Sequence, residues 1–208
     1  MTAEHAEEIE PDYLSQHNEV EEMIRQMPSG ILNWYPFSED ERILYLTDQT
    51  ADDPVVQMLK KKGLHVDTAS LDETVLSSFM ELHKGSYNCI AAVGILERSR
   101  NPQATLVAWK SLLVSGGKLL LAVENRLGLR FFCGDRDPYT GRNFDGIENY
   151  RKVDPHDLKV QTGRDYSRAE VIEMLEQAGF RKHPAYSVMP GLEAPQLIYS
   201  EEVLPTED

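Results

Sequence analysis

The sequence predicts an α/β fold whose sheet is mostly parallel. Helical patterns alternate with short strand patterns along most of the 208 residues. The inner strand patterns are continuous apolar runs, as expected for parallel strands that are covered on both faces. The last two strand patterns are joined by a segment too short to hold a helix, which indicates an antiparallel pair at the end.

The chain divides into an acidic N-terminal arm with a helix, residues 1–30, and an α/β domain, residues 31–208. The spacing of apolar side chains predicts a helix over Tyr13–Met27 that ends at Pro28-Ser29-Gly30. The next segment, Ile31–Phe37, is apolar and aromatic. We expect it to pack into the core; a cover over a ligand pocket is the alternative.

The elements of the domain then follow in alternation. Strands are expected at Arg42–Thr47, Leu64–Thr68, Tyr87–Ile95, Lys118–Val123, Tyr186–Met189 and Gln196–Ser200. Helices are expected at Pro54–Lys62, Asp72–His83, Pro102–Leu113 and from a cap at Ser167 to Ala178. Asp52 or Asp53 can cap the first of these helices, and Ser167 with Glu170 forms a capping box for the last. A turn at Ser115-Gly116-Gly117 precedes the strand at 118–123.

Composition excludes several classes of function. The net charge is −14, and such a surface repels phosphate backbones, so no nucleic-acid partner is expected. The two cysteines and six scattered histidines form neither a disulfide framework nor a zinc spacing, so no metal is expected. No apolar run approaches the roughly 18 residues of a membrane span. Because the N-terminus also lacks a signal-peptide pattern, a cytoplasmic protein is expected.

The carboxyl ends of the predicted strands supply the first site candidates. Ligands of open α/β sheets bind outside these ends, and Glu124 and Asn125 stand directly after one of them. Gly94 and Glu97 hold the same place after the preceding strand. The alternatives are a capped turn for Asn125, tight packing for Gly94 and a solvated ion pair with a neighbouring arginine for Glu97.

Several motifs carry a family resemblance. The run LLVSGGKLLLAV, the capped helix ending in AGF and the two closing strands resemble the C-terminal half of class I S-adenosylmethionine-dependent methyltransferases, which have a Rossmann-like fold. Over about residues 33–205, a narrower resemblance is to methyltransferase-like domains associated with bacterial glycosyltransferases of surface-polysaccharide and lipopolysaccharide biosynthesis. Its motifs are NWYPF, VGILE, ENRLGL, TGRNFDGIENY, YSRAEVIEMLEQAGF and IYSEEVLP.

The resemblance implies a cofactor, partners and roles for individual residues. S-adenosylmethionine is the implied cofactor, a glycan or glycolipid intermediate the implied substrate, and a glycosyltransferase an implied partner. The implied cofactor-binding residues are Thr47, Asp48, Asp67 and Gly94. Asp67 matches the acidic position that binds the ribose hydroxyls of the cofactor. The alternative for Asp67 is a solvated residue at the end of a strand, and the alternative for Asp48 is a turn residue. Glu97 and Glu124 are the candidate catalytic bases.

Two departures from the family pattern lie in the first half of the chain. The family has a glycine-rich turn after the first strand, whereas no glycine occurs from Glu39 to Lys62. Side chains throughout this loop hinder the close approach of a cofactor, so the cofactor motif is degenerate. Between Asp48 and Ser86 the chain has room for only one further strand with its helices. We therefore expect one edge strand of the family's sheet to be missing.

The long loop after Asn125 holds candidate substrate-binding residues. These are Arg130, Asp135, Asp137, Tyr139, Arg142, Asp145 and Tyr150. Arginine suits bidentate phosphate contacts and tyrosine suits stacking on a sugar ring. Asp135-Arg136-Asp137 also mimics the DxD motif of glycosyltransferases, a weak signal. An ordered loop held by its own hydrogen bonds is the structural alternative.

Three hypotheses of function remain open. The first is an S-adenosylmethionine-dependent methyltransferase of bacterial cell-surface glycan biosynthesis. The second is a catalytically inactive protein with the same fold that binds a glycan or a partner. The third, well behind, is a DxD-type glycosyltransferase.

Overall fold

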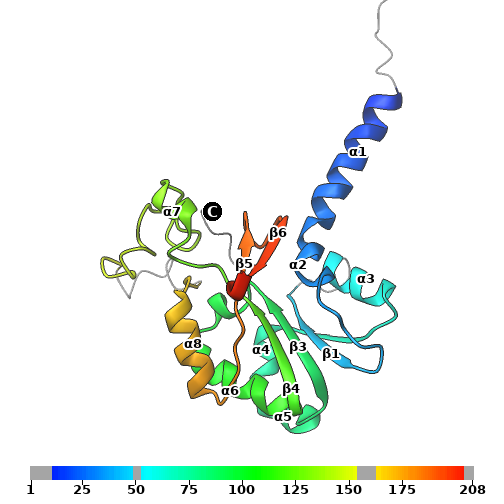
Figure 1. Cartoon of the computed structure of the whole chain (residues 1–208), viewed down its shortest axis with the longest axis vertical. Helices are drawn as coiled ribbons and strands as arrows, with labels where there is room; N and C mark the ends of the chain where they lie inside the picture. The colour runs from blue at the N-terminus through cyan, green and yellow to red at the C-terminus, as the bar shows by residue number, and fades with distance from the viewer. Residues whose placement is uncertain (1–10, 49–52, 154–162, 204–208) are drawn as a thin grey trace, which may run out of the picture.

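The computed structural model describes residues 11–48, 53–153 and 163–203. It contains a four-stranded sheet in the order β2-β1-β3-β4, in which every neighbouring pair is parallel. The strands are β1 (Arg42–Leu46), β2 (His65–Ala69), β3 (Tyr87–Val93) and β4 (Leu113–Ala122). The predicted α/β fold with a mostly parallel sheet is confirmed (Figure 1).

Helices connect the strands, and two of them, α3 and α8, begin at capping residues that the sequence predicts. They are α1 (Pro11–Gln26), α2 (Gly30–Asn33), α3 (Pro54–Lys61), α4 (Leu71–Thr74), α5 (Ser77–His83), α6 (Pro102–Leu112), α7 (Leu129–Phe132) and α8 (Arg168–Gln177). Short 3-10 helices are η1 (Met27–Ser29), η2 (Leu96–Arg98) and η4 (Glu201–Val203). Asp53 caps α3 by accepting the N–H groups of Val55 and Val56, and Ser167 forms the capping box of α8 with Glu170.

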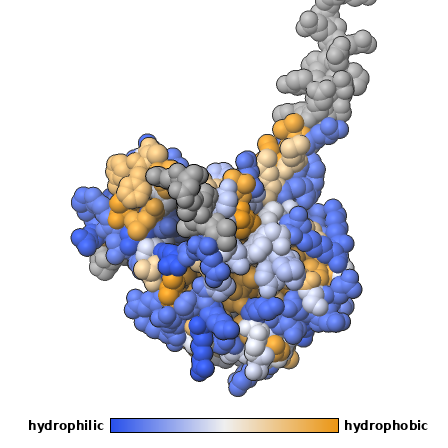
Figure 2. All heavy atoms as spheres, in the orientation of Figure 1, coloured by the Kyte–Doolittle hydropathy of each residue, from blue (hydrophilic) through white to orange (hydrophobic). Residues whose placement is uncertain are grey.

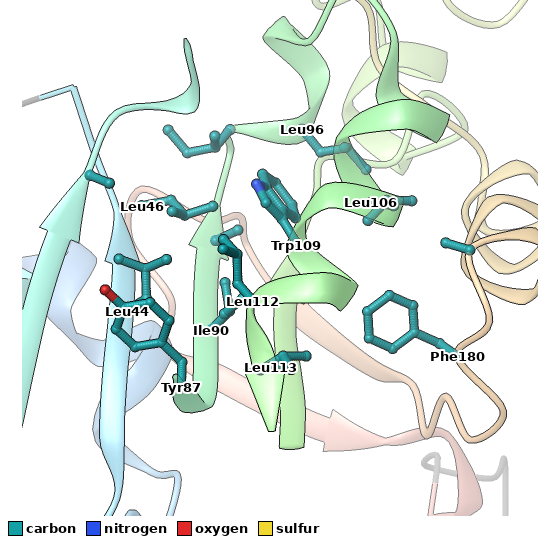
Figure 3. Packing of buried hydrophobic residues seen from close by; sticks show 14 residues of the cluster. Leu44, Leu46, Tyr87, Ile90, Leu96, Leu106, Trp109, Leu112, Leu113 and Phe180 are labelled. Atoms are coloured by element: carbon teal, nitrogen blue, oxygen red, sulfur yellow. The ribbon is translucent and has the colours of Figure 1, made fainter. Parts of the chain in front are cut away.

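One face of the sheet packs against α4, α5, α6 and α8. Leu44 and Leu46 of β1 point to this side, where Trp109 of α6 and Phe180 after α8 complete the cluster (Figure 3). Trp109 is fully buried, and its Nε1–H donates to the hydroxyl of Thr74 at 3.0 Å. This bond ties α4 to α6 inside an otherwise apolar layer.

The opposite face is covered by α2, α3 and a C-terminal hairpin. Ile43 and Tyr45 point to this side because successive residues of a strand alternate between faces. Ile31 and Leu32 of α2 are buried against them. The sequence segment 31–37 therefore packs into the core at its start, as expected.

The hairpin consists of β5 (Tyr186–Met189) and β6 (Leu197–Ser200), which pair antiparallel. The predicted antiparallel pair is confirmed. In the described part of the chain, the two strands form a sheet of their own and do not pair with the four-stranded sheet. Val188 and Ile198 pack against the buried cluster that contains Ile43 and Tyr45. The hairpin therefore covers part of this face of the sheet.

Two predicted elements differ from the structure. The helix expected at Asp72–His83 is wrong as a single element, because α4 ends where the buried hydroxyl of Thr74 donates to the carbonyl of Leu71 at 2.7 Å. The turn expected at 115–117 lies within the bounds of β4. Tyr87 is opposite Leu113 and Cys89 is opposite Lys118, so the intervening residues of β4 bulge out of register.

The edge of the sheet agrees with the expected loss of a strand. Residues 70–86, all of which the structure describes, contain α4 and α5 and no strand between β2 and β3. β2 is therefore the edge strand beside β1. Removing an outer strand leaves the pairings β2-β1, β1-β3 and β3-β4 intact.

The N-terminal helix projects away from the sheet (Figure 1). The predicted helix over Tyr13–Met27 is confirmed, because α1 ends at Gln26; the 3-10 helix η1 and the short helix α2 follow it. The apolar side chains of Val20, Met23 and Ile24 are exposed. No helix in the described ranges is long and apolar enough to span a membrane.

Candidate functional site

The carboxyl edge of the sheet brings five of the predicted residues together. The chain leaves β1 toward β2 on one side, while β3 lies on the other, so the order of strands reverses between β1 and β3. Open α/β sheets bind ligands at such a point. The residues that follow β1, β3 and β4 here are Thr47, Asp48, Gly94, Glu97 and Glu124.

Glu97 is the most deeply buried acid of this edge. It lies in η2, directly after β3, and is 1% exposed. Its Oε1 accepts the backbone N–H of Glu124 at 2.8 Å, whereas no described residue donates to Oε2. Burial raises the pKa of Glu97 to about 7, and the charge of Glu124 adds to this while the accepted N–H opposes it. A carboxyl with this pKa can exchange a proton near neutral pH.

Asp165 is a second buried acid beside Glu97, and sequence reasoning missed it. It is 1% exposed, and neither of its carboxylate oxygens has a hydrogen-bond partner in the described part of the chain. Burial raises its pKa to about 7, and the nearby charges of Glu97, Asp137 and Glu124 act in the same direction. The backbone N–H of Arg164 donates to the carbonyl of Glu97 at 2.9 Å, which holds this segment against η2.

The loop residues Asp137 and Tyr150 form a bonded network next to this pair. The carboxylate of Asp137 is buried and accepts the N–H groups of Tyr139 and Thr140 through Oδ1. Its Oδ2 accepts the hydroxyl of Tyr150 at 2.8 Å, and that hydroxyl accepts the N–H of Asp165 at 2.9 Å. Burial raises the pKa of Tyr139 and of Tyr150. Asp137 is therefore fully bonded, in contrast to Asp165.

Glu124 and Asn125 follow β4 at the carboxyl edge of the sheet. Glu124 is partly exposed; its Oε1 accepts the N–H of Leu192 in the hairpin turn at 3.4 Å, and its Oε2 lies 3.9 Å from Nη2 of Arg130. Asn125 accepts the N–H of Leu127 through its side chain at 3.0 Å. Asn125 thus caps the following turn, which is the alternative stated for it.

Comparison with known proteins adds the fold family. No protein-family model matches the chain, and no curated protein does. A solved S-adenosylmethionine-dependent methyltransferase from Thermotoga maritima, described as a possible histamine N-methyltransferase, superposes with a TM-score of 0.53 at 13% identity and covers 90% of each chain. The chain has the Rossmann-like methyltransferase fold.

Two further solved structures are similar at a lower level. A putative methyltransferase from Bacillus halodurans gives a TM-score of 0.46 at 16% identity, covering 78% of this chain and 73% of its own. A complex of the Haloferax volcanii Trm112 methyltransferase activator with a putative methyltransferase gives 0.49 at 12% identity, covering 83% and 74%. We assign the methyltransferase fold from the Thermotoga structure alone.

Two of the residues predicted to bind a cofactor, Thr47 and Asp48, make contacts within the chain. The hydroxyl of Thr47 donates to the capping residue Asp53 at 2.8 Å. Asp48 pairs with Arg98 of η2 at 2.7 Å, which links the loop after β1 to the segment after β3. Gly94 has a φ of 62°, and a Cβ there would meet no atom within 4 Å. The space beside Gly94 is therefore open.

Asp67 does not lie where a strand-end ribose ligand would. It is the third of the five residues of β2 and is opposite Leu44 in the middle of β1. Its Oδ2 accepts from Nε and Nη2 of Arg42 at 3.0 and 2.7 Å, and Arg42 is the first residue of β1. The predicted place of Asp67 near the end of the strand is wrong, because β2 ends one residue later than predicted. The carboxylate of Asp67 also binds Arg42, which lies at the amino end of β1.

The remaining loop candidates are distributed between internal contacts and the surface. Arg142 donates to the buried Asp145 at 2.7 Å, and Asp135 is exposed. Among the described residues, no three His, Cys, Asp or Glu side chains are grouped to hold a metal. The outer surface over α7 is apolar (Figure 2). Its exposed large side chains are Leu127, Leu129, Phe132 and Phe144.

Two surface hollows lie away from the Glu97–Asp165 pair. One of about 440 Å³ is at the amino ends of β1 and β2 and is lined by Arg42 and Asp67, among others. The other, of about 540 Å³, lies on the loop, where Arg126 and Arg151 contribute to the lining. Arg126 is engaged by Glu170 at 2.8 Å. Neither hollow contains the residues that the fold brings to the carboxyl edge.

Proposed function

We propose that the chain is an S-adenosylmethionine-dependent methyltransferase that acts on a glycan or glycolipid intermediate, with a glycosyltransferase as a partner in the same biosynthesis. The observation that carries the enzymatic part is the position of Glu97. It is a buried carboxyl with a pKa raised to about 7, at the point where the strand order reverses. The narrower glycan assignment is supported by the sequence motifs of the loop.

The residues at the carboxyl edge fit the cofactor on the side of β3. At Gly94 no side chain stands between the backbone and the crevice, and the space a Cβ would occupy is open. Thr47 and Asp48 would border the cofactor from β1. S-adenosylmethionine, when bound, supplies an electrophilic methyl group.

The chain's own acids would then serve the acceptor. A hydroxyl or amino acceptor must lose a proton as it becomes methylated, and Glu97 can take up that proton in its ionised form. Glu124 borders the same crevice and keeps its N–H bonded to Glu97, so it positions the base. We assign Glu97 as the catalytic residue and Glu124 as a positioning residue.

A binding domain without catalysis is the second candidate, and a specific observation favours it. The hydroxyl of Thr47 is bonded to Asp53, and Asp48 is paired with Arg98. The cofactor half of the crevice therefore satisfies its polar groups internally. On this view the fold persists while the acceptor half alone binds a ligand.

Titration calorimetry with S-adenosylhomocysteine separates the two candidates. The methyltransferase should bind it with micromolar affinity, and Gly94→Asn should weaken binding by about tenfold or more by filling the open space. Gly85→Asn is the matched control, because Gly85 has a φ of 60° and equally open space at the other end of β3. No heat and no thermal shift at millimolar ligand would exclude the methyltransferase and leave the binding domain.

A further inference from the structure

The buried pair Glu97 and Asp165 leaves three carboxylate oxygens without donors. These are Oε2 of Glu97 and both carboxylate oxygens of Asp165. Buried polar atoms are almost always bonded, and a buried carboxylate without donors is strongly unfavourable. Both side chains are 1% exposed, so water at the surface does not serve them. The unbonded oxygens call for a ligand that supplies donors.

The arginines near this pair are all engaged elsewhere. Arg98 pairs with Asp48 at 2.7 Å, and Arg130 is nearest to Glu124. Arg164, although it precedes Asp165, donates through Nη2 to Asn149 and Glu170, and its guanidinium lies over the rings of two tyrosines. The charge of Arg98 lowers the pKa of Glu97 and that of Arg130 lowers the pKa of Asp165, but no described group donates a hydrogen bond to the three oxygens.

Besides Arg98 and Arg130, the described groups that interact with the pair are acids and aromatic side chains. The acids that act on it are Glu124 and Asp137, and the aromatic residues are Tyr139, Tyr150 and Tyr166. Gly163 is packed so closely against the ring of Tyr139 that a Cβ would lie 2.5 Å from it. Carboxylates beside an aromatic ring favour a cation over a neutral ligand.

We propose that Glu97 and Asp165 bind a primary ammonium group of the ligand. An ammonium group has three N–H donors and no acceptor, which matches three oxygens that lack donors. A hydroxyl group has only one donor and would leave two of the oxygens unbonded. That the ammonium group belongs to the acceptor of methylation rests on the proposed function. Binding of the ammonium group itself requires no cofactor.

The proposal predicts that binding releases protons. Because the pKa of each carboxyl is raised to about 7, both are partly protonated at neutral pH without ligand. A bound cation favours the ionised carboxylates, so the protons leave as the ligand binds. Binding should strengthen from pH 6 to pH 7 for the same reason.

Calorimetry of the full chain without cofactor tests the proposal, using two buffers of different ionisation heat to count the protons released. The probes are ethylammonium and glucosamine, with glucose as the neutral control and tetramethylammonium as a cation without N–H donors. We expect both primary ammonium probes to bind in the millimolar range with proton release, and the two controls not to bind. If glucosamine binds more tightly than ethylammonium, the ligand is an amino sugar. If the two probes bind equally, the site recognises the ammonium group alone.

Variants locate the binding. Asp165→Asn and Glu97→Gln should each weaken binding by about tenfold and reduce the proton release. Asp72→Asn, which removes an exposed acid of α4, should change neither. Absence of binding by both probes, equal binding of tetramethylammonium, or an equal loss in Asp72→Asn would overturn the proposal. Because no cofactor is present, this result is independent of the S-adenosylhomocysteine titration.

Discussion

Replacing Asp165 by asparagine should stabilise the protein increasingly as the pH rises. The pKa of Asp165 is raised from 3.8 to about 7. Between these two values the folded state holds a proton that the unfolded state has released, so the stability of the wild type falls as the pH increases. At 1.36 kcal/mol per unit, the full cost above pH 7 is about 4 kcal/mol. Asparagine stays neutral and avoids this cost.

Urea unfolding from pH 5 to pH 8 measures the effect. The free energy of unfolding of Asp165→Asn minus that of the wild type should grow by about 2.5 kcal/mol over this range. The hydrogen bonds of the new amide add an offset that does not vary with pH. Asp72→Asn removes an exposed acid and should show a much smaller trend. A pH-independent difference for Asp165→Asn would refute the reasoning that burial holds this carboxyl protonated.

Two further substitutions test the bonds that hold the loop and the last helix. Tyr150→Phe removes a hydroxyl that donates to Asp137 and accepts from the N–H of Asp165, so it should lower the free energy of unfolding by about 1–3 kcal/mol in urea titrations; an unchanged midpoint would contradict this. Ser167→Ala removes the cap of α8, whose box also uses Glu170, and should cost about 1 kcal/mol by the same measurement. Ser167→Asp should recover most of that loss.

The strands and the capped helices could be predicted because their signals are local. The apolar runs of β1 and β3, the proline that begins α3 and the box of Ser167 with Glu170 each lie within a few residues. Such patterns determine an element regardless of its neighbours. The same reasoning failed for α4 and α5, which are separated after Thr74, a residue whose hydroxyl donates to Leu71 and accepts from the distant Trp109.

The site could be predicted only in part, because its chemistry depends on contacts between distant segments. The places of Glu97 and Glu124 follow from the ends of β3 and β4, and the sequence already identifies both. Asp165 lies more than forty residues after β4, in a segment without strand or helix pattern. Bonds between distant segments hold it there: the N–H of Arg164 donates to the carbonyl of Glu97, and the N–H of Asp165 donates to the hydroxyl of Tyr150. The predicted place of Asp67 near the end of a strand was wrong because β2 ends one residue later than expected.

The most direct test of the central claim is the transfer of a labelled methyl group from S-adenosylmethionine to glucosamine. The wild type should incorporate label at a rate that rises with pH through about 7, as Glu97 ionises. Glu97→Gln should bind S-adenosylhomocysteine like the wild type yet lose about 10²-fold or more of the rate. Incorporation that is unchanged in Glu97→Gln, or absent from a wild type that binds both ligands, would contradict the claim that this carboxyl serves methyl transfer.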